Sequence, residues 1–380
     1  MFDYEVLRFV WWILVGVLLV GFTITDGFDM GVGILLPIIG KTDTERRIMI
    51  NSIAPHWDGN QVWLVTAGGA LFAAWPMVYA ASFSGFYIAM VLVLAALFFR
   101  PIGFDFRGKK DDQRWRNLWD GGLFFGSFVP ALVFGVAFGN LLQGVPLSIE
   151  PLTAHISYKG NFFGLLNPYA IVAGLISLMM IVAQGGAWLQ MKTSGELYER
   201  SRSATQVTAL ATMVFFIIAG IWLIYGIDGY TVTSTMDTLA PSDPFRKSVE
   251  VQAGAWLANY NKMPILWAVP ILAAVLPLGT VLFSRMKCDV LTFLTTSLTI
   301  PCVISTAGIT MFPFVMPSTV DPNMSLTMWD ATSSLLTLRV MLVVALIFVP
   351  TVLAYTLWSY YKMWGRLDKQ HIEDNSHSLY

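Results

Sequence analysis

The sequence of 380 residues has little charge, few cysteines and few histidines, and each scarcity excludes a class of protein. Charged residues make up 12% of the chain and hydrophobic residues 56%, whereas a soluble domain carries roughly 25% charged residues. A soluble core cannot bury so much apolar surface, but a bilayer can. The net charge of −1 gives no basic surface for nucleic acid. The composition therefore indicates a polytopic membrane protein.

The two cysteines, Cys288 and Cys302, lie 14 residues apart and form no C-x-x-C pair. A disulfide framework and a cysteine metal site are therefore both excluded as interpretations. The sequence also has no Gly-rich phosphate loop, nucleophile elbow or H-E-x-x-H helix. No self-contained active site is predicted.

Long apolar runs predict about nine transmembrane helices, since roughly 20 apolar residues cross the hydrocarbon core and only helices satisfy their own backbone there. Asp3 and Glu5 stand where a signal peptide would be basic, so the first run is expected to remain as a helix. We expect one all-α integral membrane domain over 1–380, with its largest outer loop at 227–262. The predicted spans are approximately 7–36, 57–80, 82–100, 118–142, 164–190, 204–226, 263–284, 289–315 and 336–361.

Lysine and arginine are distributed unequally between the two sides of this predicted topology. When the spans alternate, 17 of the 23 basic residues fall on one side. Cytoplasmic connections carry such an excess. The pattern predicts that the N-terminus lies outside and the C-terminus on the cytoplasmic side.

Ionisable residues inside the spans are the strongest candidates for function, because each costs about 2.5–3.5 kcal/mol to place near the bilayer centre. Asp26 and Asp29 stand at i, i+3 in the first span and so share one helix face. Asp58 lies at the start of the second span. We expect these carboxyl groups to face one another in the cytoplasmic half and to relay protons. The alternative is structural, with a carboxylate capping a helix or pairing with Arg46, Arg47 or Arg100.

The start of the second span is unusually polar, with His56, Trp57 and Gln61 around Asp58. His56 is the one histidine predicted within a span, and one histidine cannot supply the axial ligands for several haems. We expect it to be a hydrogen-bonding member of this cluster, and we predict no metal ligands in this chain. The remaining histidines are His155 in an outer loop and His371 and His377 in the C-terminal tail.

Several long segments resemble subunit II of the cytochrome bd ubiquinol oxidases, and the similarity extends essentially from end to end. They are Asp26-Gly27-Phe28-Asp29-Met30-Gly31, the run from Glu45 through Asn51 to Trp63, Phe98-Phe99-Arg100-Pro101, Gly139-Asn140-Leu141-Leu142-Gln143-Gly144, and Phe312-Pro313-Phe314-Val315-Met316-Pro317-Ser318. The segments 147–160 and 231–250 match least.

The resemblance implies two four-helix bundles plus one peripheral helix, paired with a haem-bearing subunit I. That complex would oxidise quinol at the outer face and reduce O2 to water, taking protons from the cytoplasm and building a proton gradient without pumping. Two haems b and one haem d would be bound mainly or wholly by subunit I. Subunit II would support haem-site assembly and hold a structural ubiquinone in a lipid-facing groove. Its other partners would be lipid and small single-span accessory subunits, and it would lie in the bacterial inner membrane with a periplasmic N-terminus.

The resemblance also implies roles for particular side chains. Asp29 and Asp58, with Asp26 nearby, would form one proton path, in which Arg100 and the polar cluster are supporting groups. Some family members have Glu at position 58, so the carboxylate rather than the residue is expected to matter. A second proton path at the subunit interface would use Asp105, Lys109 and Tyr380. An oxygen route would pass beside Trp63.

Two other functions fit the same features. A secondary transporter also has many spans and intramembrane carboxylates. A purely structural scaffold would contain the same carboxylates without moving protons. Movement of a solute by the chain alone in proteoliposomes would favour the transporter, whereas co-purification with a haem-bearing partner chain would favour the oxidase.

Overall fold

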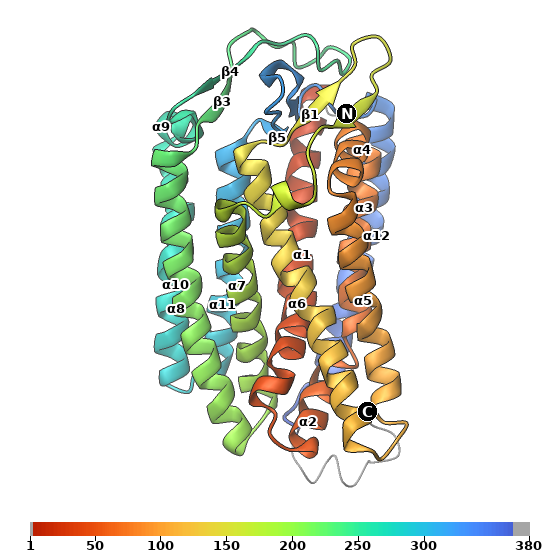
Figure 1. The fold of residues 1–380 in the computed structure, drawn as a ribbon, viewed down its shortest axis with the longest axis vertical. Helices are drawn as coiled ribbons and strands as arrows, with labels where there is room; N and C mark the ends of the chain where they lie inside the picture. The colour runs from red at the N-terminus through yellow and green to blue at the C-terminus, as the bar shows by residue number, and fades with distance from the viewer. Residues whose placement is uncertain (1–2, 368–380) are drawn as a thin grey trace.

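The protein is a tall bundle of helices that run along its longest axis (Figure 1). The computed structural model describes residues 3–367. Within this part of the chain, eight helices are long and apolar enough to cross a membrane. The six strands of the described residues are short and form three two-stranded antiparallel sheets. The prediction of an all-α membrane protein is confirmed, and its count of nine spans was approximate.

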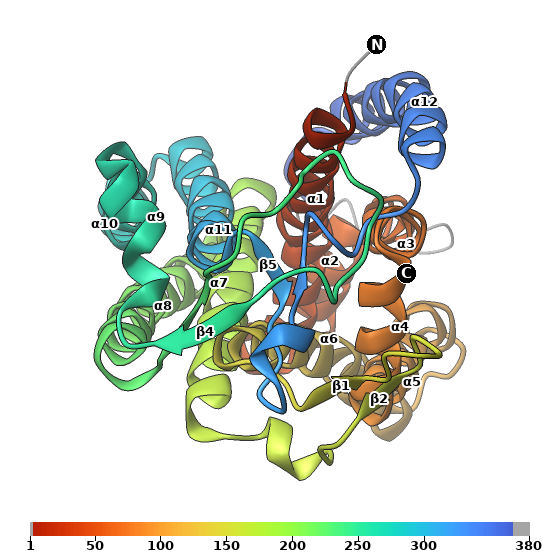
Figure 2. The ribbon, with the colours of Figure 1, turned by 90° about the horizontal axis from the view of Figure 1, so that it is seen from above.

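Seen from above, the helices form two groups with one helix at the edge (Figure 2). In the first group α1 packs on α3 and α6, and α5 packs on α6. Its helices are α1 (Tyr4–Ile39), α3 (Trp57–Ala74), α4 (Pro76–Gly85), α5 (Tyr87–Arg107) and α6 (Gln113–Gln143).

In the second group α8 packs on both α7 and α10, and α11 packs on both α7 and α10. Helix α7 also packs on α1 and α6 and so joins the two groups. The helices of the second group are α7 (Pro168–Lys192), α8 (Gly195–Gly226), α10 (Ala268–Arg285) and α11 (Asp289–Met311).

Helix α12 (Leu335–Lys362) lies at the periphery beside α1 and α3 (Figure 2). Leu338 is the one residue of this fully described helix that is buried. Because an apolar helix exposed all round is stable in lipid but not in water, α12 itself indicates a membrane environment. This arrangement matches the two bundles and peripheral helix expected from the resemblance.

The second predicted span, 57–80, is divided between two helices. Helix α3 ends at Ala74 and α4 begins at Pro76, with Trp75 in a non-helical conformation between them. Proline has no N–H to donate and disfavours helical geometry in the residue before it, so the helix breaks there. Consequently, the predicted third span, 82–100, begins within α4, whereas the helix that occupies most of it, α5, begins only at Tyr87.

Helices α1 and α7 approach closely because glycines face each other at their crossing. A Cβ atom added at Gly31 would lie 2.2 Å from the Ile181 carbonyl oxygen, and one added at Gly185 would lie 2.4 Å from Gly31. Small residues allow helix backbones to pack directly in membranes. This crossing therefore fixes the two bundles against each other.

The upper end of the bundle is closed by hairpins and short helices (Figure 1). The loop 227–262 folds over it, and Trp256 packs with Tyr230 and Phe314 in a buried cluster. Trp256 of this loop is thus covered by the chain itself. The elements here are β1 (Leu147–Ile149), β2 (Ile156–Tyr158), η1 (Phe163–Leu165), β3 (Gly229–Val232), β4 (Val249–Gln252), η2 (Ala255–Leu257), α9 (Ala258–Lys262), η3 (Pro264–Trp267), β5 (Phe314–Met316), η4 (Pro322–Met324) and β6 (Leu326–Thr327).

Buried charges hold this loop to the rest of the upper end. The Lys247 ammonium lies 2.8 Å from the Asp330 carboxylate, with both side chains almost fully buried. Burial raises the pKa of the Asp330 carboxyl, and the nearby Lys247 charge opposes that rise. Arg8 of α1 donates to Thr332 and to the carbonyl of Thr238. The loop is therefore part of the folded domain.

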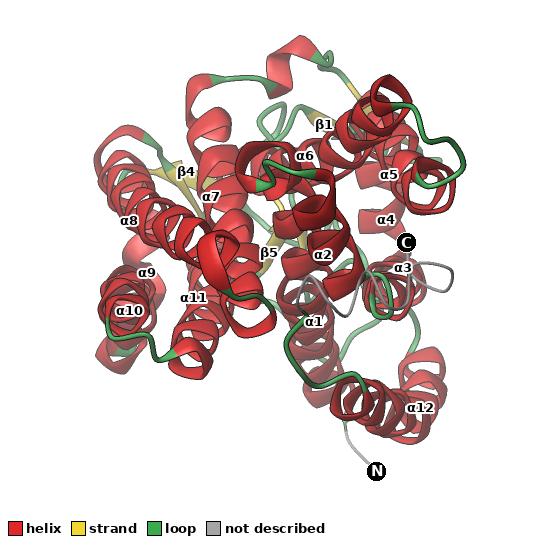
Figure 3. Cartoon of the chain, turned by 90° about the horizontal axis from the view of Figure 1, so that it is seen from below, coloured by secondary structure: helices red, strands yellow, loops and turns green. Residues whose placement is uncertain are grey.

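The basic connections gather at the lower end, where α2 (Asp43–Ile53) lies across the bundle (Figure 3). Helix α2 begins with a capping box in which Thr42 and Glu45 satisfy each other's backbone N–H groups. The N-terminal end of α1 lies at the opposite, upper end (Figure 1). The assignment of the lower end to the cytoplasm remains a prediction.

The glycine crossing generates a stability prediction. Gly31→Ala should lower the free energy of unfolding by about 1–3 kcal/mol, because the new methyl group overlaps the α7 backbone. Gly16→Ala in the same helix is the matched control, since nothing lies within 4 Å of its added Cβ. Thermal unfolding in detergent should show a lower midpoint for Gly31→Ala alone. Equal midpoints would contradict the close packing.

Candidate functional site

The deepest charged group is an ion pair between α1 and α5. Arg100 donates through Nη1 to Asp26 Oδ2 at 2.8 Å and through Nη2 to Asp26 Oδ1 at 2.6 Å. Both side chains are at most 1% exposed. Such a two-point contact satisfies both carboxylate oxygens and fixes the guanidinium plane. Asp26 is therefore held as the counter-ion of Arg100.

Asp29 lies one turn further along α1 and has a different environment. Its Oδ2 accepts a 2.7 Å hydrogen bond from Asn60 Nδ2 on α3, and Asn60 in turn accepts one from the Tyr360 hydroxyl on α12. Its Oδ1 is buried and has no hydrogen-bond partner among the described residues. Asp29 thus keeps one unoccupied acceptor in the interior of the protein.

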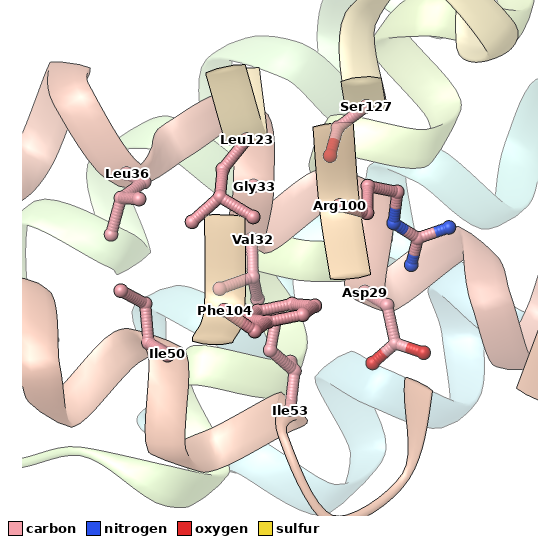
Figure 4. Close-up of a pocket in the computed structure, with 10 residues that line it drawn as sticks. All are labelled: Asp29, Val32, Gly33, Leu36, Ile50, Ile53, Arg100, Phe104, Leu123 and Ser127. Atoms are coloured by element: carbon pink, nitrogen blue, oxygen red, sulfur yellow. The ribbon is translucent and has the colours of Figure 1, made fainter. Parts of the chain in front are cut away.

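A small cavity adjoins Asp29 (Figure 4). It is lined by α1, α2, α5 and α6 and has a volume of about 10 Å³, close to the space that a single water molecule needs. Figure 4 shows the Asp29 carboxylate next to the Arg100 guanidinium, with the Phe104 ring beside them. Apart from Asp29, Arg100 and the Ser127 hydroxyl, its lining side chains are apolar. The site has room for a water molecule but not for an organic ligand.

Glycines bring α6 close enough to enclose this site. A Cβ atom at Gly33 of α1 would lie 2.2 Å from Ser127 Oγ, and one at Gly126 of α6 would lie 2.7 Å from the Ala96 carbonyl oxygen. Any larger side chain would push α6 away from α1 and α5. The local sequence therefore keeps the two carboxylates away from lipid.

His56 and Trp57 surround the site with aromatic rings. The buried His56 ring lies edge-on to Tyr360 at 4.5 Å and to Trp188 at 6.0 Å between centroids. Trp57 packs on Phe104 at 5.4 Å. The expected polar cluster is thus an aromatic wall around the Asn60–Asp29 hydrogen bond. Sequence reasoning missed Tyr360 because it lies 300 residues from Asn60.

Asp58 does not face Asp29, contrary to the expectation of paired buried carboxylates. It lies exposed in the first turn of α3, while Asn60, two residues later, points inward. Successive helix residues are separated by about 100°, so positions 58 and 60 cannot share a face. Gln61 is half-buried between them. The inner partner of Asp29 is an amide rather than a second carboxyl group.

The remaining predicted residues lie away from Asp29. Asp105 is exposed near the end of α5. Because α5 ends at Arg107, Lys109 lies in the following turn. No ion pair between Asp105 and Lys109 is found in the described region. Trp63 is buried on α3, where a Cβ at Gly21 would lie 2.7 Å from its ring. Tyr380 lies outside the described residues.

A second charge network, which the sequence analysis missed, ties the lower ends of the helices together. The buried Asp120 of α6 lies 2.5 Å from Arg107 and 2.9 Å from Arg46. Arg107 and Arg116 both also contact Asp43 of α2, at 2.8 and 2.9 Å. A carboxylate inside the predicted span 118–142 was the signal that could have revealed it. The expected structural role of Arg46 is thus fulfilled through Asp120, not through Asp29 or Asp58.

The histidines of the described residues contact aromatic rings or solvent. No group of three or more His, Cys, Asp or Glu side chains that could hold a metal is found in residues 3–367. His56 is packed against two rings, and His155 is exposed near the hairpin of β1 and β2.

The family described as cytochrome bd terminal oxidase subunit II matches residues 7–363. This chain belongs to that family. It is 64% identical over its full length to the complete cytochrome bd-I ubiquinol oxidase subunit 2 of Escherichia coli strain K12. It is also 35% identical over 355 residues, or 92% of this chain and 94% of the relative, to the cytochrome bd ubiquinol oxidase subunit 2 of Bacillus subtilis strain 168.

A solved structure of bd oxidase from Geobacillus thermodenitrificans contains a chain of the same fold. Its TM-score to this chain is 0.57 at 12% sequence identity, covering 95% of this chain and 99% of that one. Family membership makes the protein a subunit of a bacterial respiratory terminal oxidase, which acts as an oxidoreductase together with subunit I and haem cofactors.

The Asp26–Arg100 pair generates the second prediction. Asp26→Asn should lower the free energy of unfolding by about 3–5 kcal/mol, because it leaves a buried guanidinium without a counter-ion. The double variant Asp26→Leu/Arg100→Met should recover most of that loss, since an apolar pair carries no desolvation penalty.

Chemical unfolding of the purified complex in mixed micelles measures both values. Asp228→Asn, at an exposed position between α8 and β3, is the matched control. If the double variant is as unstable as the sum of its single variants, the two side chains do not act as a pair.

Proposed function

We propose that this chain supplies protons to the oxygen-reducing site of a quinol oxidase and supports assembly of its haem centres. The complex would oxidise quinol at the periplasmic face and reduce O2 to water, taking protons from the cytoplasm to build a gradient without pumping. The chain alone would be inactive. The membrane would be the bacterial inner membrane, with the N-terminus periplasmic and the C-terminus cytoplasmic.

The proposal rests chiefly on the different hydrogen-bond partners of the two carboxylates on α1. Asp26 has both oxygens bound by Arg100, whereas Asp29 has one oxygen bound by a neutral amide and the other unpartnered. A proton bound at Asp29 Oδ1 would add a donor facing the small cavity, where a water molecule could accept it. Asp26 would remain ionised as the fixed counter-ion. Asp29 is therefore the residue that we assign to proton transfer.

The haem cofactors of the complex would be held by subunit I. Two haems b and one haem d need several axial ligands, and the arrangement of His56 and His155 does not supply them. These haems would carry out electron transfer and oxygen chemistry when bound. The contribution of this chain would be a packed surface that encloses the redox centres from one side. A structural ubiquinone and small single-span subunits remain proposed additional partners.

Exposed acids would connect the buried site with the partner subunit and the cytoplasm. Asp58 is exposed on α3, close along the helix to Asn60, and an ionised carboxyl group is unfavourable against lipid. Contact with subunit I would remove Asp58 from lipid and place it on a proton path toward Asp29. Asp105, Lys109 and Tyr380 would form a second path at the interface, and Trp63 would flank an oxygen route.

The proton-supply proposal predicts a specific loss of activity. Asp29→Asn keeps the shape of the side chain and can still accept a hydrogen bond from Asn60, but it cannot release a carboxyl proton. We expect haem absorbance to be retained and oxygen consumption by the purified complex to fall by about 10²–10⁴-fold, the usual contribution of a positioned acid or base. Asp58→Asn should produce a smaller loss.

Asp120→Asn, which removes the buried acid of the lower charge network, controls for a general loss of buried charge. Lost haem absorbance in Asp29→Asn would indicate an assembly role instead. Normal oxygen consumption with normal haem would overturn the assignment of Asp29 to proton transfer.

The alternative of a secondary transporter is tested by the isolated chain. Many spans and intramembrane carboxylates fit that class as well. Proteoliposomes containing only this chain should show no solute uptake that depends on a proton gradient. Uptake in the absence of subunit I would favour the transporter, whereas co-purification with a haem-bearing chain would favour the oxidase.

A further inference from the structure

An apolar groove with a basic rim opens on the outer surface of the bundle, away from the Asp29 site. It lies between α1, α6, α7 and α8 and has a volume of about 560 Å³, within the usual range of roughly 300–1,000 Å³ for ligand sites. Its walls come from the last turns of α1, the middle of α6 and α7, and the second to fourth turns of α8. The groove therefore starts at the lower end of the bundle, which Figure 3 shows from below.

The wall of this groove is suited to hydrocarbon. Phe124 and Phe128 stack at 5.4 Å between centroids and form one flat side. Ile38 is 53% exposed and Val207 is 64% exposed on the opposite edges. A continuous apolar surface of this kind binds an acyl chain without any directional contact.

The rim carries two cations, Lys41 and Arg200. The Glu45 carboxylate already accepts from Arg200 and from the backbone N–H groups of Lys41 and Thr42. Lys41 is exposed, its ammonium donates to the Ile38 carbonyl, and no ion pair to it is found in residues 3–367. The Lys41 ammonium at the mouth of the groove is thus available to bind an anion beside the apolar wall.

We propose that the groove binds one anionic membrane phospholipid, with its phosphate at Lys41 and Arg200 and an acyl chain along Phe124, Phe128 and Val207. The groove has charge at the membrane boundary and an apolar wall further in, and a phospholipid has its phosphate and its acyl chains in the same order. Basic pockets between helices at the cytoplasmic end of a bundle bind anionic headgroups. A neutral quinone ring would leave the Lys41 ammonium without an anion. The bound lipid would seal the lower junction between the two bundles.

The test measures the lipid retained by the purified oxidase complex. Anionic phosphatidylglycerol or zwitterionic phosphatidylcholine is added separately to the delipidated complex. Native mass spectrometry then measures how much of each lipid is retained. We expect phosphatidylglycerol to be retained at about one per complex more tightly than phosphatidylcholine. Lys41→Glu should weaken its retention by about fivefold or more, because a basic residue at the surface is replaced by an acidic one. Val207→Trp should weaken it as well, by filling the groove.

Two matched controls lie outside the groove. Lys362→Glu makes the same charge change at the exposed end of α12, and Val290→Trp makes the same size change in the first turn of α11. Both should leave retention unchanged, and all variants should keep the intact mass and haem absorbance of the complex.

Equal retention of the two lipids, or unchanged retention in Lys41→Glu and Val207→Trp, would overturn the proposal. Loss of quinone rather than phospholipid from Val207→Trp would also overturn it, by assigning the groove to quinone. Release of the lipid by inorganic phosphate alone would show that only the anion is recognised, again contradicting a lipid site.

Discussion

The buried contact between Asp26 and Arg100 is the interaction on which the site depends. Two charges removed from water are stable only when each satisfies the other, and here both carboxylate oxygens receive a guanidinium N–H. The pair fixes α5 against α1 and commits Arg100 to one carboxylate. Asp29, one turn away, therefore has no cation of its own, although it is equally buried. The difference between two identical side chains arises from this single pairing.

Glycine packing makes that pairing possible. The crossing of α1 and α7 at Gly31 and Gly185, together with the close approach of α6 at Gly33, excludes lipid from the face that carries the two acids. In a membrane, where apolar side chains gain little by leaving lipid, close backbone contact is a principal source of helix association. The packing glycines and the two acids therefore lie in one stretch of α1, and a substitution of a glycine or an acid there affects both the helix packing and the charged site.

The sequence predicted the membrane class, most helices and the position of Asp29 inside a span, because hydrophobic length and intramembrane charge are local properties. It could not predict which acid binds Arg100, since positions 26 and 29 lie on the same face and only the rotation of α5 decides between them. It placed Asp58 inward, whereas the helical period turns Asn60 inward instead. The contribution of Tyr360 depends on where a helix 300 residues away docks, and no local pattern contains that information.

A proton is proposed to move at Asp29 while Asp26 stays ionised. Infrared difference spectroscopy of the complex during reduction and reoxidation tests this directly, because protonated and ionised carboxyl groups absorb differently. We expect a protonated-carboxyl signal that is absent in Asp29→Asn and unchanged in a variant of an exposed acid such as Asp228→Asn. A signal that survives in Asp29→Asn, or that belongs to Asp26, would contradict the proposed role of Asp29.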